Sequence, residues 1–343
     1  MGKITVAIAF VKKKCYNASA IDCDKLQLSV NDTKQRCSKL KIAVLGCGAM
    51  GMLIGGYLSQ KNEVYLIDID EKKIKAVSED GIHIETGNGE TTHVHPFAVS
   101  GAKQVGEVDV VIVFVKALAS KTALENNMEL FGKNTYVITL QNGAGHEALL
   151  TQFVNKERVV IGVTNHNSSI VSANHIKHGG SGKTFIGLTS GNSDALLPIA
   201  ENFTACGVET EVQENINKLI WGKLFVNISV SALTGVLQVP IGYIGDNANA
   251  NHMMEMLVKE AVVVANAMGL DFTEEEALSG PRQTIIKAPN GLTSIYADLR
   301  DGRKTEVDTI SGAVVAAGKK VGVKTPCHEM IVNMVHAMES RPR

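Results

Sequence analysis

The sequence predicts an α/β protein, in which a doubly wound parallel sheet of the Rossmann type is followed by an all-helical domain. Apolar runs alternate with helical patterns from Lys39 to about residue 211, which is typical of a parallel sheet covered by helices. From Val212 to Met338 almost every segment has helical period instead. The length of 343 residues agrees with two domains, because one hydrophobic core rarely serves more than about 250–300 residues.

The same patterns divide the chain into three parts. Residues 1–38 are an N-terminal extension to which we assign no role, residues 39–211 the Rossmann domain, and residues 212–343 the helical domain. Three of the six cysteines lie in the extension, at a spacing that fits no zinc pattern, and reduced thiols in a cytoplasm explain them most simply.

Composition excludes several classes of protein. The chain is 45% hydrophobic and 20% charged, as ordinary globular proteins are, and its formal net charge is −1. No strong field would therefore draw it to nucleic acid or to a membrane surface. We also expect no membrane span, because no apolar run approaches the roughly 20 residues that a span requires.

The elements of the first domain can be predicted in order. KIAVLG predicts a strand, AMGMLIGGYLSQ a helix, EVYLID a strand and DEKKIKAVSED a short helix. GIHIET and HVHPFAV alternate with period two, like a small antiparallel pair. VDVVIVFVK is an uninterrupted β-branched run, typical of a strand buried on both faces. LASKTALENNMELF then predicts a helix, and TYVITLQNG and RVVIGVTNH the next strands.

The first strand ends in GCGAMG, where Gly46, Gly48, Ala49, Met50 and Gly51 are the candidates for binding a dinucleotide. The first glycine permits the tight turn, the second lets a pyrophosphate approach the backbone, and the third lets helix and strand pack closely. Glycines also close ordinary turns, but here a strand and a helix flank the motif on the correct sides.

Asp68 ends the second strand, at the distance expected of the acid that binds an adenosine ribose. Its carboxylate would repel a 2′-phosphate at ~4 Å by ~1–4 kcal/mol. Asp68 therefore favours NAD over NADP, although Lys72 and Lys73 could partly neutralise it.

The segment NKLIWGKLFVNISVSALTG predicts a helix that is apolar almost all round and hence buried. Lys223, Asn227 and Ser231 recur every four residues and so share one face. A buried lysine is costly unless something binds it, while a lysine that reaches the surface beside a satisfied core Asn is the alternative. In SIYADLRDGRKTEVDTISGAVVAAG we expect Glu306 to start a helix and to be a candidate partner for this lysine.

Five segments of the chain resemble the ketopantoate reductase family: KIAVLGCGAMG, FVKA with Lys116, LQNGAG with Asn142, WGKLFVNISVSALTG, and SIYADLRDGRKTEVDTISG. The resemblance runs from about Lys39 to Glu329 and implies that a 2-oxo acid binds in the cleft between the domains. It implies Lys223 as the catalytic acid and Glu306 as a group that binds substrate and positions the lysine. It further implies substrate contacts from Asn227 and Ser294, with Lys116 and Asn142 near the cofactor and the reacting centre.

Two departures from the family pattern bear on specificity. Ser231 stands where these enzymes often carry a second Asn, so one polar contact to the substrate differs. Ile69 follows Asp68, whereas NADP-using members commonly carry an Arg near the end of this strand. The sequence therefore resembles the NAD-dependent D-2-hydroxy acid dehydrogenase branch, which includes D-mandelate dehydrogenase and acts on acids branched at C3. We expect NAD as cofactor, with NADP less favoured.

Other readings remain open. A histidine could be the acid, with His146 and His166 as candidates, but a lone histidine is more often a surface or core group. HVH at 93–95 and HIKH at 175–178 lack the further ligands of a metal site, so we expect no metal. A 3-hydroxy acid dehydrogenase of the hydroxyisobutyrate type and a non-catalytic dinucleotide sensor are the alternative functions. We also expect a cytoplasmic homodimer, and the identity of the C3 substituent stays undetermined.

Overall fold

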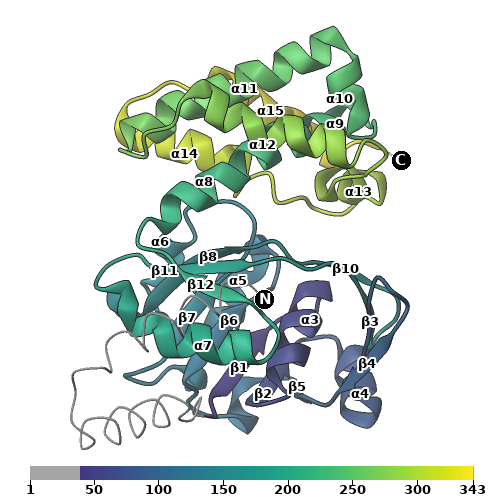
Figure 1. The fold of residues 1–343 in the computed structure, drawn as a ribbon, viewed down its shortest axis with the longest axis vertical. Helices are drawn as coiled ribbons and strands as arrows, with labels where there is room; N and C mark the ends of the chain where they lie inside the picture. The colour runs from purple at the N-terminus through teal and green to yellow at the C-terminus, as the bar shows by residue number, and fades with distance from the viewer. Residues whose placement is uncertain (1–38, 343) are drawn as a thin grey trace, which may run out of the picture. The chain divides into compact units, whose positions relative to one another are not determined.

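The computed structural model describes residues 39–342, and the predicted N-terminal extension lies outside them. From Lys39 onward the chain packs as one compact unit. Within it a sheet domain is followed by a helical domain, which Figure 1 shows in green and yellow, and the predicted fold class is confirmed.

The main sheet has eight strands in the order β12-β11-β8-β7-β6-β1-β2-β5. Neighbours are parallel except that β11 runs antiparallel to β8. The strand order reverses beside β1, as in doubly wound sheets that bind ligands at the carboxyl ends of their strands. The strands are β1 (Lys41–Leu45), β2 (Glu63–Ile67), β5 (Phe97–Val99), β6 (Val110–Val113), β7 (Tyr136–Thr139), β8 (Val159–Thr164), β11 (Thr184–Leu188) and β12 (Thr210–Val212).

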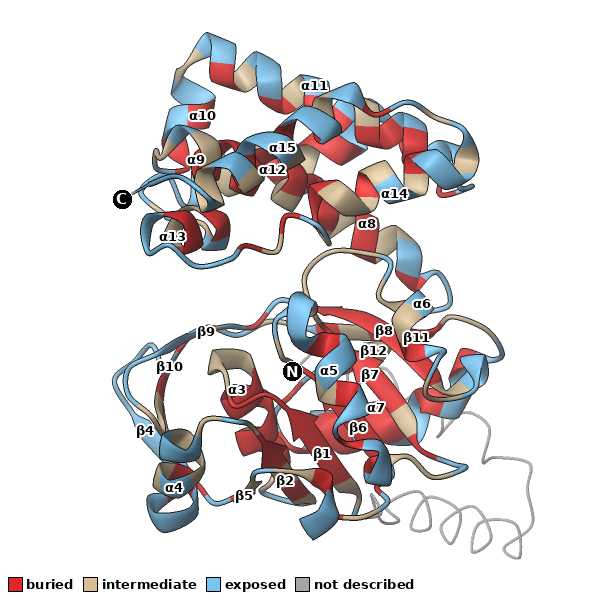
Figure 2. Ribbon diagram, turned by 180° about the vertical axis from the view of Figure 1, so that it is seen from behind, coloured by how far each residue is buried: buried red, intermediate tan, exposed pale blue. Residues whose placement is uncertain are grey.

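Both faces of this sheet are buried. Successive apolar residues of β1 point to opposite faces, and each face packs against its own helices. Ile42 and Val44 pack in one apolar cluster with α3 (Ala49–Leu58) and α7 (Leu197–Ala205). Ala43 and Leu45 pack in a second cluster that contains residues of α5 (Ser120–Glu125) and α6 (Glu147–Leu150). Figure 2 shows the central strands buried along their length, which explains their uninterrupted apolar sequences.

A second, four-stranded sheet lies beside the first and was only half predicted. Its order is β4-β3-β10-β9, where β3 (Ile82–Glu85) and β4 (Thr91–Val94) form the expected antiparallel pair. The segment HVHPFAV is not one strand, because it splits at Pro96 and its second half, β5, joins the main sheet. The strands β9 (Asn167–Ile170) and β10 (His175–Gly180) carry no apolar alternation that would have predicted them.

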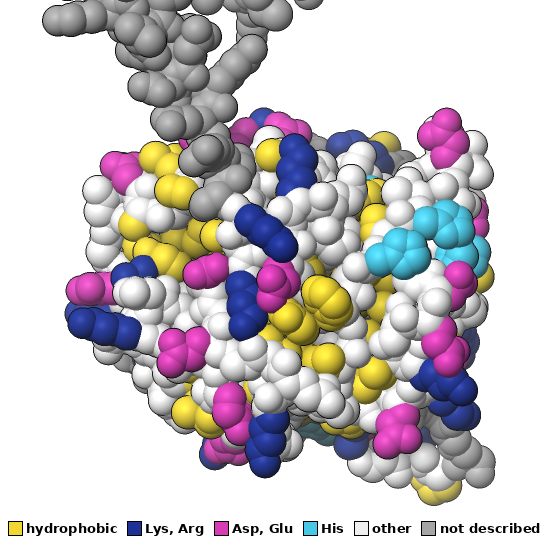
Figure 3. All heavy atoms as spheres, turned by 90° about the horizontal axis from the view of Figure 1, so that it is seen from below, with side chains coloured by type: hydrophobic (Ala, Val, Ile, Leu, Met, Phe, Trp, Pro, Cys, Tyr) yellow, Lys and Arg dark blue, Asp and Glu magenta, His cyan; other side chains and the backbone are white. Residues whose placement is uncertain are grey.

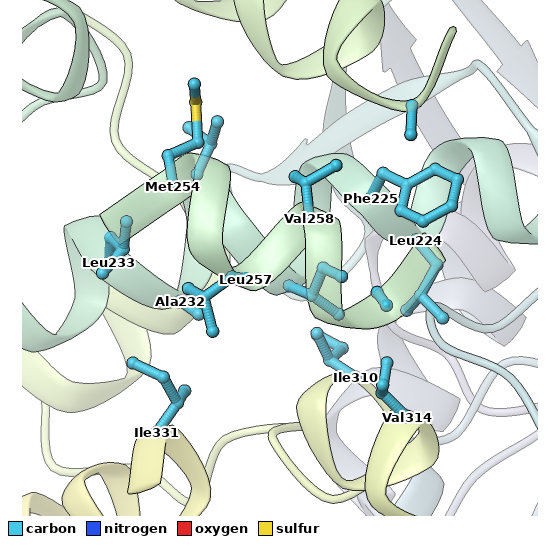
Figure 4. Packing of buried hydrophobic residues seen from close by; sticks show 14 of the residues in the cluster. Leu224, Phe225, Ala232, Leu233, Met254, Leu257, Val258, Ile310, Val314 and Ile331 are labelled. Atoms are coloured by element: carbon cyan, nitrogen blue, oxygen red, sulfur yellow. The ribbon is translucent and has the colours of Figure 1, made fainter. Parts of the chain in front are cut away.

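The remaining helices form the helical domain around one apolar core (Figure 4). They are α8 (Ile216–Val226), α9 (Ala232–Leu237), α10 (Gly242–Asp246), α11 (Ala248–Ala267), α12 (Glu274–Lys287), α13 (Ser294–Arg300), α14 (Ser311–Val321) and α15 (Pro326–Glu339), with α4 (Glu71–Asp80) belonging to the sheet domain. The predicted boundary near Glu211 falls within β12, and α8 begins four residues after that strand ends.

One helical run is longer and more apolar than the sequence suggested. Residues 216–237 form 22 consecutive helical residues with a mean hydropathy of 1.5, which by length and composition could cross a membrane. In the structure most of this stretch is buried inside the protein, where it forms the centre of the helical core.

On the face shown in Figure 3, acidic and basic side chains are interspersed, in keeping with the near-neutral formal charge.

Candidate active site

The glycine loop has the geometry that a dinucleotide requires. Gly46 has φ of +108°, and a Cβ there would lie 2.9 Å from the backbone nitrogen of Val115. A Cβ on Gly51 would lie 1.9 Å from the carbonyl oxygen of Gly46, so the helix and strand can approach only because Gly51 has none. Around Gly48, in contrast, no atom lies within 4 Å of an added Cβ. The loop is thus tight on its protein side and open on the other.

The N-terminus of α3 lies at this open side. The helix begins at Ala49, followed by Met50, and its N-cap Gly48 offers no side chain to the first backbone N–H groups. Unsatisfied N–H groups and the helix dipole together attract phosphate. The residues present therefore fit a dinucleotide whose pyrophosphate binds at Gly48, Ala49 and Met50.

Asp68 lies directly after β2 and braces the glycine loop. Its Oδ2 accepts a hydrogen bond from the Cys47 backbone nitrogen at 2.6 Å, and its Oδ1 accepts one from the Asp70 nitrogen at 3.0 Å. The neighbouring Ile69 is 94% exposed. The acid thus has a structural role that the sequence did not suggest, in addition to the predicted contact with a ribose.

Lys223 lies on α8 and reaches back to the sheet domain. Its Nζ donates a hydrogen bond of 2.9 Å to the carbonyl oxygen of Thr164, the last residue of β8. Burial lowers the pKa of this amine from its ordinary value, because the charged form is desolvated. Lys223 also lines a small cavity together with Asn142 and Asn227. Three of the predicted site residues are therefore brought together from both domains.

Ser231 does not join them in the way that a spacing of four predicts. Residues Asn227–Ser231 form a π-helical segment, in which each turn contains more residues than in an α-helix. Ser231 is buried and does not line the cavity of Lys223, while its carbonyl oxygen accepts a hydrogen bond from Thr293 Oγ1.

Glu306 differs from its prediction in two respects. It does not start a helix, because residues 306–310 form a turn and α14 begins only at Ser311. It also forms no ion pair with Lys223, both residues lying in the described part of the chain. Its Oε1 instead accepts a hydrogen bond of 3.4 Å from the Ala117 nitrogen. The lysine is satisfied by a backbone carbonyl, so the acid is not needed to bind it. Ser294, the first residue of α13, is exposed and does not line the cavity of Lys223.

Lys116, which follows β6, links the two domains. Its Nζ lies 2.9 Å from Asp298 Oδ2 on α13 and donates a hydrogen bond of 3.0 Å to the Lys304 carbonyl oxygen. Asp298 is buried and also pairs with Arg303. Lys116 thus lies at the carboxyl edge of the sheet, and its amine binds the helical domain; its position near the cofactor stays a prediction.

Comparisons with known proteins identify the family to which the chain belongs. The family described as "Ketopantoate reductase PanE/ApbA" matches residues 42–191, and "Ketopantoate reductase PanE/ApbA C terminal" matches residues 215–339. The chain belongs to the ketopantoate reductase family. The predicted membership and the prediction of an oxidoreductase are therefore confirmed.

The chain matches other members of the ketopantoate reductase family over nearly the whole length of those proteins. The 2-dehydropantoate 2-reductase of Streptococcus pyogenes serotype M18 is 30% identical over 302 residues, which are 87% of this chain and 98% of that protein. The enzyme of the same name from Halobacterium salinarum is 29% identical, over 86% of this chain and 98% of that protein.

Solved structures show the same fold. A D-mandelate dehydrogenase with NADH and anilino(oxo)acetate has a TM-score of 0.81 at 30% identity, covering 87% of this chain and 97% of that one. A ketopantoate reductase from Ralstonia eutropha has a TM-score of 0.79 at 27% identity, covering 87% and 98%.

The histidines that could replace Lys223 are engaged elsewhere. His146 Nε2 donates to the Asn142 carbonyl oxygen at 3.0 Å. His166 lies 3.1 Å from His178, which in turn lies 3.0 Å from the hydroxyl of Tyr57. Burial lowers the pKa of both His166 and His178 and so favours neutral rings, which are poor proton donors at pH 7. Residues 39–342 contain no group of three or more side chains that could hold a metal ion.

The sequence analysis identified the segment that carries Glu306 but missed the residue that anchors it, Glu339. We call residues 303–309, between α13 and α14, the strap. Its Thr305 donates through both its backbone nitrogen and its hydroxyl to Glu339 at the end of α15, at 2.8 and 2.7 Å. Lys304 and His336 also contact this carboxylate. No spacing in the sequence relates residue 339 to residue 305.

Glu339 should make a large contribution to stability. Burial by itself would raise its pKa, yet hydrogen bonds from Thr305, Lys304 and His336 lower it to about 2. We expect Glu339→Gln to reduce the free energy of unfolding at pH 7 by about 2–3 kcal/mol. Because the folded-state pKa is depressed, this contribution is present above the ordinary value of 4.5 and is lost as pH falls toward 2.

Urea unfolding at pH 7 and at successively lower pH tests this. The difference in free energy of unfolding between wild type and Glu339→Gln should shrink as the Glu339 carboxyl of wild type becomes protonated. The exposed Glu329 on the same helix is the control, and Glu329→Gln should change the free energy of unfolding by less than about 1 kcal/mol. Equal effects of the two variants would contradict the assignment.

Proposed function

We propose that this chain reduces a 2-oxo acid branched at C3 to the D-2-hydroxy acid, with NADH as the hydride donor. The observation that carries the proposal is the position of Lys223. Its amine is desolvated at the carboxyl edge of the sheet, 2.9 Å from Thr164, and shares a cavity with Asn142 and Asn227. In open α/β sheets this edge is where ligands bind.

The chemistry divides between cofactor and protein. The nicotinamide supplies the hydride to C2 of the substrate when it is bound. Protonated Lys223 donates a proton to the carbonyl oxygen, on which negative charge develops. Because burial lowers the pKa of Lys223, its ammonium is a stronger acid than an exposed lysine. Asn142 and Asn227 can donate hydrogen bonds to the substrate beside this ammonium.

Glu306 and Ser294 are proposed to contribute from the helical domain, as the family resemblance implies. Ser231 is buried outside the cavity of Lys223, and it would contact substrate only if the helix around it rearranged. Glu306 uses only its Oε1, at the long distance of 3.4 Å, and is therefore free to bind a substrate hydroxyl or to orient Lys223. Ser294 is exposed, and it would contact substrate only if α13 moved toward the cavity. Lys116 is proposed to act near the cofactor, which would require it to exchange its Asp298 contact.

Two relatives support the substrate class. The curated relatives are named 2-dehydropantoate 2-reductase, and the solved D-mandelate dehydrogenase contains NADH and anilino(oxo)acetate. The substrate could therefore carry a branched aliphatic group or a ring at C3. We expect turnover with at least one of ketopantoate, 2-ketoisovalerate and benzoylformate, assayed side by side by nucleotide oxidation. No turnover on any of these, together with tight NADH binding, would favour the dinucleotide sensor.

We expect NADH to be preferred to NADPH by at least about tenfold in kcat/KM, which corresponds to about 1.4 kcal/mol. Asp68 places a negative charge after β2, and the exposed Ile69 offers no cation to a 2′-phosphate. Initial rates with both nucleotides at a saturating 2-oxo acid measure the ratio. A preference for NADPH would contradict the assignment of Asp68.

A 3-hydroxy acid dehydrogenase of the hydroxyisobutyrate type is the alternative enzyme, and a comparison of 2-oxo with 3-oxo acids separates the two. The homodimer and the cytoplasmic location stay predictions, and light scattering of the purified protein tests the first.

A further inference from the structure

We propose that Gly143 and Thr309 form an interdomain clasp that positions Asn142 of the Rossmann domain against the Glu306 turn of the helical domain. Both are positioning residues rather than catalytic ones. The inference rests on the proposed function, because it assigns them a role in aligning the site around Lys223.

The clasp consists of two hydrogen bonds on either side of Gly143. The backbone nitrogen of Ala144 donates to the Thr309 carbonyl oxygen at 3.0 Å. The hydroxyl of Thr309 lies 3.4 Å from the Asn142 carbonyl oxygen and 3.2 Å from the Glu306 carbonyl oxygen of its own turn, so it can donate to either. A single residue of the helical domain thus contacts the residues before and after Gly143.

Each partner is held by its own domain. Thr309 closes the turn that begins at Glu306, because its backbone nitrogen donates to the Glu306 carbonyl oxygen at 3.1 Å. On the other side, His146 Nε2 lies 3.0 Å from the carbonyl oxygen of Asn142. The Asn142 carbonyl is therefore bound by a donor from each domain, and movement of the turn would be transmitted to it.

Gly143 is the residue that permits this approach. Its φ is +103°, and an added Cβ would lie 2.0 Å from the carbonyl oxygen of Thr309 and 2.6 Å from its carbonyl carbon. Both are backbone atoms, so no side chain could rotate away to make room. A methyl group would have to separate the two domains at this point.

The loop offers a matched control two residues later. Gly145 also has a positive φ, of +87°, but no atom lies within 4 Å of an added Cβ there. Alanine at either position has the same backbone strain, whereas only alanine at 143 collides with Thr309. Comparison of the two variants therefore distinguishes the effect of breaking the clasp from the effect of straining the loop backbone.

The location of Gly143 makes it sensitive. It lines the small cavity with Lys223 and Asn227, and it also lines a second cavity of about 390 Å³ that contains Ile220 and Trp221. Loss of the clasp would therefore join two spaces that are separate when it is closed, and would loosen Asn142 without touching the glycine loop at Gly46.

The test compares Gly143→Ala with Gly145→Ala. We expect Gly143→Ala to lower kcat for 2-oxo acid reduction by about 10²-fold, since misplacement by ~1 Å can have that effect. The dissociation constant for NADH should change much less than kcat, because Asn142 is only one of the residues expected near the cofactor and the glycine loop that would hold the pyrophosphate follows β1. Gly145→Ala should retain kcat within about threefold. Equal losses in the two variants, or an unchanged kcat in Gly143→Ala, would overturn the proposal.

The hydroxyl of Thr309 is tested separately. Thr309→Val removes the contacts of the hydroxyl with the carbonyl oxygens of Asn142 and Glu306 but keeps the backbone bond to Ala144, so kcat should fall by about 10-fold. Thr309→Ser restores the hydroxyl and should recover most of the lost kcat. Failure of serine to recover it would mean that packing, not the hydrogen bond, is responsible.

Amide hydrogen exchange provides a readout that does not depend on turnover. Exchange in residues 140–146 should be faster in Gly143→Ala than in wild type and unchanged in Gly145→Ala. If wild type reduces no 2-oxo acid, the proposed function fails, while this difference in exchange would still establish the clasp. Equal exchange in the two variants would overturn the clasp.

Discussion

Lys223→Met is expected to lower kcat for 2-oxo acid reduction by about 10²–10⁴-fold, the usual range for loss of a general acid. Methionine keeps the apolar stem that packs along α8 and removes only the ammonium. The dissociation constant for NADH should change little, because Lys223 lies on α8 and the dinucleotide loop follows β1. Steady-state rates and fluorescence titration with NADH measure the two quantities.

Lys218 provides the matched control on the same helix. Its Nζ also donates to a backbone carbonyl oxygen, that of Asp271 at 2.8 Å, but it does not line the cavity of Lys223. Lys218→Met should therefore leave kcat within about twofold, as a surface substitution away from the site does. Full activity of Lys223→Met would reject the lysine as the acid.

The pH dependence follows from the same group. Reduction needs the protonated ammonium, so kcat should fall as pH rises through the pKa of Lys223. Burial holds this pKa below the ordinary 10.5, because desolvation disfavours the charged form. The fall should be absent from the residual activity of Lys223→Met. A decrease that persists unchanged in the variant would indicate that another group titrates.

The fold was predictable where burial alone dictates the sequence. Strands β1, β6 and β7 are buried on both faces and consist of continuous apolar runs, which no surface element would carry. Strands β9 and β10 were not predictable, since NSSI and HIKHGG are partly exposed and polar. The pairing of β10 with β3 joins residues more than 80 positions apart, a contact that local periodicity cannot contain.

The structure brings Lys223, Asn142 and Asn227 together, but the contacts that hold Lys223 differ from those expected from the sequence. A buried lysine needs a partner, and from the sequence an acid is the obvious one. The structure supplies the Thr164 carbonyl instead, and backbone atoms leave no signal in the sequence. The π-helical turn at Asn227–Ser231 was also not predicted, because its sequence resembles that of any buried helix. Contacts through the strap depend on the path of the chain between α13 and α14, which spacing does not reveal.

Gly51→Ala should abolish NADH binding and destabilise the protein. The added Cβ would lie 1.9 Å from the carbonyl oxygen of Gly46, so α3 would have to move away from β1. Overpacking of this kind usually costs about 1–3 kcal/mol of folding free energy. It would also displace the N-terminus of α3, where the pyrophosphate is expected to bind. We expect the dissociation constant for NADH to rise at least about 100-fold, measured by fluorescence titration beside thermal unfolding.

Gly48→Ala separates binding from folding within the same loop. Gly48 has φ of −76°, which alanine adopts freely, and no protein atom lies within 4 Å of its Cβ. The melting temperature should therefore stay within a few degrees of wild type, given that the loss at a glycine N-cap is about 1 kcal/mol or less. The methyl group would nevertheless occupy the space through which a phosphate approaches the backbone, so NADH binding should weaken by about tenfold or more. A normal affinity in Gly48→Ala would mean that the open side of the loop does not face the dinucleotide. In that case the open space around Gly48 would have a cause other than the dinucleotide. Any loss of NADH binding in Gly51→Ala would then be explained by disturbed folding alone.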